Sequence, residues 1–244
     1  MKSRYLSLAL FGSITLAACG GDDEPTITPP VDTSGDIIGE VNLYDEGTTE
    51  IDNSGMTVRV EGTPASTTTD ASGSFTIPDV DFGSYTLVYE KTGYGTFKSF
   101  DLDHSGGNTV ITEIPSLGQV STTSITDLTA NSDGTTVTVG ATTEPAASSG
   151  NTRYVRFFFS TTSDVSDENY EAVLETLEAQ SNPYNLNLTT ASLTALGFSS
   201  GETVYVRAYG ESFQSNQYDD PDLGRTVFPN VNSTSSAAAS FEVP

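Results

Sequence analysis

Apolar and polar residues alternate with a period of two through most of the chain after residue 35. In the first half, apolar side chains occupy every second position at Met56, Val58, Val60, Phe75 and Ile77. Such alternation predicts strands with one buried and one solvated face. Turn-forming clusters of Asp, Ser and Gly separate these short strands, and the last apolar positions of this half are Val110, Ile114 and Leu117. The pattern predicts an antiparallel β-sandwich over residues 36–118.

The alternation resumes after a polar stretch at 119–124 and continues to the end of the chain. The segments that carry it are 125–128, 137–141, 154–159, 201–209 and 239–243. Within the third segment, Val155, Phe157 and Phe159 share one face, which we expect to lie in the core. The predicted fold class is therefore all-β, with two tandem antiparallel β-sandwiches over 36–118 and 119–244.

One segment of the second half has a helical period instead. Tyr170, Val173, Leu174 and Leu177 form a single apolar stripe. Ser166 is a plausible N-cap, and like charges at Glu171, Glu175 and Glu178 require that packing stabilise the helix. We therefore expect one amphipathic helix near 166–180, inserted into the second sandwich.

The start of the chain has the pattern of a secretory leader. Basic residues precede an apolar run that ends in Leu16-Ala17-Ala18-Cys19-Gly20. This motif resembles a bacterial lipobox, which implies a signal peptide over 1–18 and acylation of Cys19. Residues 19–35 then form a flexible tether. The resemblance implies a protein that is lipid-anchored at the outer membrane through Cys19. The acidic cluster after the cysteine resembles a surface-export signal, which would expose the protein on the cell surface, and it is equally typical of a solvated tether that carries no such signal.

A second resemblance rests on an ordered series of blocks in the first half of the chain. The blocks are Gly39-Glu40-Val41, residues 55–60, residues 68–77, residues 83–87 and Gly93-Tyr94. Together they resemble a carboxypeptidase regulatory-like domain over 36–118. The resemblance implies a transthyretin-like sandwich of seven strands that has no catalytic residues of its own and serves as a structural or accessory module.

The second half has a resemblance of its own. Residues 201–209, preceded by Leu196, are similar to the sixth strand of a fibronectin type III or related immunoglobulin-like domain. The similarity implies an immunoglobulin-like topology for 119–244.

Charge and chemistry narrow the possible functions. Lys and Arg number 9 against 33 Asp and Glu, a net charge of −24, which repels nucleic acid and makes it a poor partner. With one His and one Cys, zinc sites built from several such ligands are impossible. The single histidine, His104, lies in a loop-like stretch, so we expect an exposed side chain rather than a member of a catalytic triad. We predict no enzyme activity and no organic cofactor.

The stretch 211–236 is longer than the usual connection in a sandwich and is typical of a functional or a disordered loop. Asp219, Asp220 and Asp222 could start a calcium site, form a solvated acidic tip, or pair in part with Arg225. Tyr218 and Phe228 could hold both ends of an ordered excursion, and with Arg225 they are candidates for partner binding.

These observations favour a non-catalytic cell-surface lipoprotein that acts as a structural or protein-interaction module. Two alternatives stay open: a glycan-binding lipoprotein of an outer-membrane nutrient-uptake system, and an accessory subunit of a surface hydrolase. The absence of Trp counts against a sugar platform, while eleven Tyr favour it.

Overall fold

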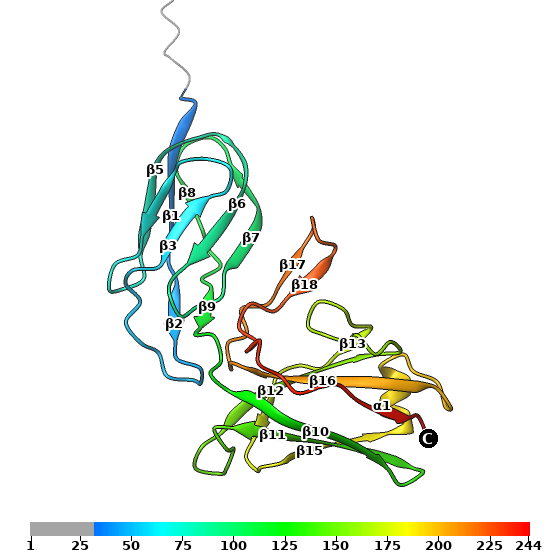
Figure 1. Ribbon diagram of the computed structural model, residues 1–244. Helices are drawn as coiled ribbons and strands as arrows, with labels where there is room; N and C mark the ends of the chain where they lie inside the picture. Colours follow the sequence, from blue (N-terminus) through cyan, green and yellow to red (C-terminus); the bar gives the residue numbers. More distant parts are fainter. Residues whose placement is uncertain (1–31) are drawn as a thin grey trace, which may run out of the picture. The chain divides into compact units, whose positions relative to one another are not determined.

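Strands make up nearly all the regular structure of residues 32–244, which a computed structural model of the protein describes (Figure 1). The predicted all-β sandwich architecture is confirmed. Cys19 and the predicted leader lie outside the described residues. Within 32–244 no helix is long and apolar enough to cross a membrane.

The first sandwich is built from short strands joined by tight turns. Its strands are β1 (Ser34–Gly39), β2 (Asn42–Tyr44), β3 (Thr57–Val60), β4 (Ser66–Thr68), β5 (Phe75–Asp81), β6 (Gly83–Glu90), β7 (Phe97–His104), β8 (Thr109–Val110) and β9 (Ser116–Gly118). One sheet has the order β5-β1-β8 and the other β4-β3-β6-β7. Most pairs are antiparallel as expected, but β1–β8 and β2–β9 are short parallel pairs.

The alternating residues of the first half form its core. Met56, Val58, Val60 and Ile77 are fully buried between the two sheets. The prediction differs at the end of this sandwich, where Val110 and Ile114 are 63% and 45% exposed and only Leu117 is buried. β8 is two residues long and lies at a sheet edge, so nothing covers its outward side chains among the described residues.

The second sandwich follows with longer strands. Its elements are β10 (Ser124–Ser132), β11 (Thr136–Glu144), β12 (Arg153–Ser160), β13 (Ala172–Val173), β14 (Leu177–Ala179), β15 (Tyr184–Thr189), α1 (Thr190–Ala195), β16 (Thr203–Glu211) and β19 (Ala239–Glu242). One sheet has the order β10-β11-β15, and the other β13-β12-β16-β19, with β14 also paired to β12. As predicted, Val155, Phe157 and Phe159 face the core between these sheets.

The helix predicted near 166–180 is wrong. This segment is extended and adds the short strands β13 and β14 to the edge of β12. The backbone amides of Glu171 and Leu174 donate to the carbonyls of Phe159 and Phe157, at 2.8 and 3.1 Å. These bonds pair backbone carbonyls at the open edge of β12. A helix would instead bring the like charges of the glutamates together. The only helix among residues 32–244 is the short α1, capped by Thr189.

A segment between β16 and β19 runs across the outside of the second sandwich. We call residues 212–232 the crossing segment; it contains the hairpin β17 (Tyr218–Asp220) and β18 (Arg225–Val227). Phe228 from this segment packs with Phe158, Val165 and Tyr209 in a buried cluster outside the β12–β16 sheet. β12 is therefore buried on both faces, which alternation alone did not predict.

Residues 32–244 form one compact unit. The two sandwiches have separate hydrophobic cores within it. Whether 36–118 and 119–244 fold independently stays a prediction.

Candidate functional site

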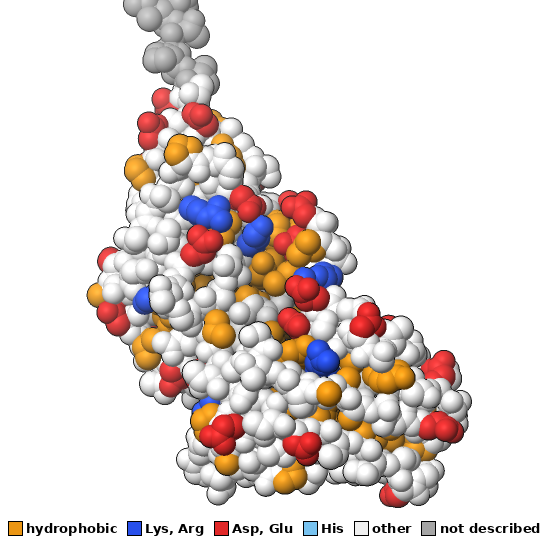
Figure 2. Space-filling model, in the orientation of Figure 1, with side chains coloured by type: hydrophobic (Ala, Val, Ile, Leu, Met, Phe, Trp, Pro, Cys, Tyr) orange, Lys and Arg blue, Asp and Glu red, His pale blue; other side chains and the backbone are white. Residues whose placement is uncertain are grey.

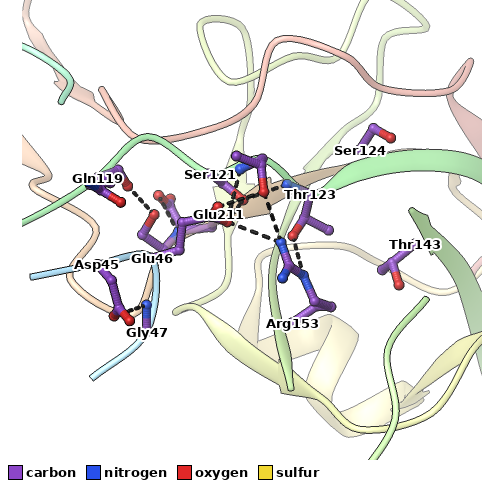
Figure 3. Close-up of polar contacts among 12 residues, drawn as sticks. Asp45, Glu46, Gly47, Gln119, Ser121, Thr123, Ser124, Thr143, Arg153 and Glu211 are labelled. Atoms are coloured by element: carbon purple, nitrogen blue, oxygen red, sulfur yellow. Dashed lines mark hydrogen bonds and ion pairs between the residues drawn. The ribbon is translucent and has the colours of Figure 1, made fainter. Parts of the chain in front are cut away.

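The two sandwiches meet at a polar network around Glu46, in the loop after β2 (Figure 3). The Glu46 carboxylate accepts from the Arg153 guanidinium at 3.1 Å and from the Thr122 amide at 2.9 Å. The Nε of Arg153 donates to Thr123 Oγ1 at 2.7 Å. The side chains of Arg153 and Glu46 are only 15% and 22% exposed, so this ion pair is shielded more than an ordinary surface pair. We call this contact region, together with the crossing segment on the first sandwich, the junction.

The crossing segment holds the first sandwich through side-chain amides. Asn216 accepts from the Gly118 amide at 2.8 Å and donates to the Gly118 carbonyl at 3.2 Å. Asn230 donates to the same carbonyl at 3.0 Å and to the Gln214 carbonyl at 2.7 Å. Both asparagines are buried, so breaking these bonds would leave unpaired polar groups inside the protein.

Two glycines allow the close approach. A β-carbon at Gly95 would lie 2.5 Å from the carbonyl carbon of Pro229, and one at Gly118 would lie 2.7 Å from the Gln214 oxygen. Real side chains do not reach such distances to backbone atoms. These positions therefore need glycine for contact with the crossing segment.

Aromatic rings complete the junction at both ends of the hairpin. The Tyr218 ring centroid lies 5.8 Å from Phe97 and 6.0 Å from Phe100, both on β7. The Phe228 centroid lies 5.1 Å from Phe158 in the second sandwich. Tyr218 and Phe228 therefore hold the two ends of an ordered excursion, one against each sandwich.

The three carboxylates proposed for calcium do not converge. Asp219 is exposed and accepts from Thr226 Oγ1 at 2.6 Å, while Asp220 is 6% exposed and accepts from the backbone amides of Asp222 and Leu223. Among residues 32–244 no group of three or more His, Cys, Asp or Glu is placed to hold a metal. Calcium binding stays a prediction that these contacts do not support.

The candidates for partner binding differ in their access. Arg225 pairs with Glu168 at 3.1 Å, and the Arg225 side chain is 27% exposed. Tyr218 is partly buried against β7, and Phe228 is 5% exposed. A partner could reach Arg225 and the rim of Tyr218, but not Phe228 in this conformation. Partner binding by these residues stays a prediction.

His104 is not the exposed loop residue that we expected. It ends β7 with no exposed surface, its Nε2 lies 3.0 Å from the Val80 carbonyl oxygen, and its Nδ1 lies 2.7 Å from Thr109 Oγ1. A carbonyl only accepts, so Nε2 donates to Val80, and Nδ1 shares a hydrogen bond with the threonine hydroxyl. The ring joins β5, β7 and the start of β8, and both of its nitrogens are engaged in structure.

A buried ion pair in the second sandwich was not predicted. Arg156 Nε donates to Glu211 at 3.0 Å, and their side chains are 2% and 0% exposed. Arg156 also donates to the Leu174 carbonyl and to Thr176, and its guanidinium lies 4.7 Å from the centroid of the Phe228 ring. Burial raises the pKa of Glu211 to about 7, and the nearby arginine opposes this shift only in part. A signal was present in the sequence, since a charged residue interrupts the aromatic run 154–159.

Two hollows lie side by side at the junction and share Tyr154. The first hollow, of about 410 Å³, is lined by the loop 45–49 and by Gln119, Thr152 and Arg153. The second hollow, of about 390 Å³, is lined by Arg156, Glu175, Thr176, Glu178, Phe213, Ser215 and Gln217. The Phe213 ring meets the Tyr154 ring edge to face at 5.7 Å. Burial, with the carboxylates of Glu178 and Asp45 nearby, raises the pKa of the Tyr154 hydroxyl.

Comparison with known proteins gives one family match, to residues 46–115, and several structural similarities of low TM-score. No curated protein matches the chain. Among solved structures, a Bacteroides uniformis protein provisionally described as carbohydrate-binding is 14% identical, with 85% of this chain and 98% of that chain covered and a TM-score of 0.31. A DUF3823 family protein of Parabacteroides merdae is 12% identical, with 86% and 98% covered and a TM-score of 0.31.

A type II cohesin–X-dockerin complex of Acetivibrio cellulolyticus is 25% identical, with 35% of this chain and 58% of that chain covered and a TM-score of 0.31. At these TM-scores the structural similarities carry no argument. The fibronectin type III resemblance of 119–244 stays a prediction. Residues 46–115 match the family model of the carboxypeptidase regulatory-like domain, a non-catalytic domain, which supports the resemblance found over 36–118.

Proposed function

We propose that the protein is a non-catalytic module of the bacterial cell surface, held to the outer membrane by a lipid on Cys19. Its two sandwiches act as one unit that presents the junction for binding. The match of residues 46–115 to a non-catalytic domain supports the first part, and the lipobox-like leader supports the second.

The observation that carries the proposal is the junction itself. Glu46 and Arg153 join the sandwiches on one side, and the crossing segment returns from the second sandwich to bind Gly118 in the first. Two sandwiches on a flexible linker would not need contacts between residues 98 and 112 positions apart. A fixed relative placement is useful where residues of both sandwiches form one surface.

The surface charge fits display in a crowded exterior. On the face drawn in Figure 2, red carboxylates are spread widely and blue Lys and Arg side chains are few. Such a surface keeps a protein soluble and repels nucleic acid and anionic lipid head groups. The lipid, and not the protein surface, is then the attachment to the membrane.

Replacing Cys19 with alanine tests the anchoring. In the native host, the wild-type protein should stay with the outer-membrane fraction after a salt wash and be cut by protease added to intact cells. Cys19→Ala should give soluble protein or unprocessed precursor. The proposal fails if the variant remains in the membrane fraction, or if protease reaches the wild-type protein only in lysed cells.

The two alternative functions, glycan binding and a role as accessory subunit of a surface hydrolase, are compatible with the same location. The aromatic and polar lining of the two hollows favours a bound ligand over a purely mechanical role.

A further inference from the structure

An exposed aromatic pair lies at the place where both sandwiches meet. Phe213 is 44% exposed although large apolar side chains are usually buried, and its ring meets Tyr154 edge to face. The Phe213 amide donates to the Glu46 carbonyl at 2.9 Å, which fixes the crossing segment to the first sandwich at this residue. Tyr154 is in β12 and is partly buried. The pair is thus held in place by both sandwiches and one ring surface is open to solvent.

The second hollow offers hydrogen-bond donors and acceptors beside this aromatic surface. Arg156 lies at the base of this hollow, only 2% exposed and bonded to Glu211, Leu174 and Thr176, so the accessible polar groups are those around it. Glu175 and Glu178 supply exposed carboxylates, and Ser215 and Gln217 supply groups that both donate and accept.

The first hollow continues the lining on the other side of Tyr154. Thr48, Thr49 and Gln119 add hydroxyl and amide groups there. Because the two hollows share Tyr154, a chain-like ligand could occupy both and cross the aromatic pair. Each hollow has a volume within the usual range of ligand sites, about 300–1,000 Å³.

The mixed lining decides between classes of ligand. The exposed carboxylates of Glu175 and Glu178 disfavour an anion, while the hydroxyl and amide groups of Thr48, Ser215 and Gln217 favour a ligand that is bound through uncharged hydrogen bonds. A neutral ligand rich in hydroxyl groups satisfies both, since each hydroxyl donates to a carboxylate or accepts from an N–H. The C–H faces of a pyranose ring, which carry partial positive charge, pack on the negative face of an aromatic ring.

We propose that a neutral oligosaccharide chain binds across Tyr154 and Phe213, with sugar units in the hollows on either side. This inference rests on the proposed function in one respect, the cell surface as the place where the protein encounters the ligand. Binding is measured with purified protein and surface location with cells, so the two can fail separately.

Affinity gel electrophoresis of the purified protein tests this inference. The gels contain one of four neutral polysaccharides: starch, xyloglucan, galactomannan or arabinoxylan. We expect at least one to retard the wild-type protein, equally at low and high salt because no net charge is involved. Phe213→Ala should weaken the binding by about tenfold or more in Kd, since the exposed ring contributes most of the apolar contact.

Leu223→Ala is the matched control, because Leu223 is also an exposed apolar residue of the crossing segment, 58% exposed and outside both hollows. It should bind as the wild type does. Equal thermal midpoints for both variants would exclude misfolding as the cause of any loss. The inference is overturned if no polysaccharide retards the wild type, or if Phe213→Ala is retarded as strongly. Phe213-dependent binding of oligolysine without any retention by polysaccharide would also overturn it and indicate a basic protein partner.

Discussion

Replacing Gly95 with alanine tests the contact that keeps the crossing segment on the first sandwich. The added β-carbon would lie 2.5 Å from both the carbonyl carbon and the β-carbon of Pro229. Pro229 is fixed in the backbone between the buried residues Phe228 and Asn230. The clash therefore cannot be relieved by rotation of a flexible side chain, and either Pro229 or the loop before Phe97 must move.

The magnitude follows from this geometry. Gly95 has no positive φ, so alanine is unstrained at this backbone position and the whole cost comes from the contact. Overpacking of this kind costs about 1–3 kcal/mol. For a chain of this size, each kcal/mol lowers the midpoint by about 2–4 °C, so we expect a fall of about 2–12 °C.

Thermal unfolding followed by circular dichroism measures the effect, and hydrogen exchange locates it. Amides of the crossing segment should lose protection first, before those of the second sandwich core. Gly150→Ala is the control, because Gly150 also has no positive φ and its β-carbon would meet nothing within 4 Å. A Gly95→Ala protein with the midpoint and exchange pattern of the wild type would refute the account of the junction.

Three further predictions follow. Burial raises the pKa of Glu211 from 4.5 to about 7, so the folded protein binds this proton more tightly. The free energy of unfolding should therefore fall as pH rises from about 4.5 to 7, by about 3 kcal/mol at most. Glu211→Gln should flatten this dependence in urea titrations, and an unchanged slope would contradict the assignment. Millimolar calcium should leave the thermal midpoint unchanged, because Asp219 and Asp220 face opposite sides of β17. A rise in the midpoint that Asp220→Ala abolishes would restore the calcium hypothesis. Residues 36–118 expressed alone should unfold cooperatively, since they have their own hydrophobic core. Their thermal midpoint should lie below that of the full-length protein, because the crossing segment is missing. A fragment without a cooperative transition would show that the sandwiches depend on each other.

The alternation of side chains predicted the strands and the inner face of β12 because a half-buried strand repeats every two residues. It could not predict that Phe158 and Arg156 are buried as well, since Phe228, which packs on both of them, comes from the crossing segment about 70 positions later. The hollows at Tyr154 were equally hidden, because the walls of the first come from both sandwiches and those of the second come from segments of the chain that lie far apart in the sequence.

Other errors arose where a local preference competed with a distant partner. The spacing of Tyr170, Val173, Leu174 and Leu177 fits a helix, but the open edge of β12 offered hydrogen bonds that the isolated segment does not have. His104 appeared exposed beside Ser and Gly, yet the Val80 carbonyl and Thr109 hydroxyl provide both of its ring nitrogens with partners.

The return of the crossing segment to the first sandwich has a consequence for biogenesis. Phe97 and Phe100 on β7 are covered by Tyr218, which is translated more than a hundred residues later. During synthesis the first sandwich therefore emerges with this apolar side of β7 open, and it stays open until nearly the whole chain has been made. Products truncated before residue 218 would keep that surface uncovered. An uncovered apolar surface favours aggregation, and chaperones and proteases could use it to distinguish incomplete chains from finished ones.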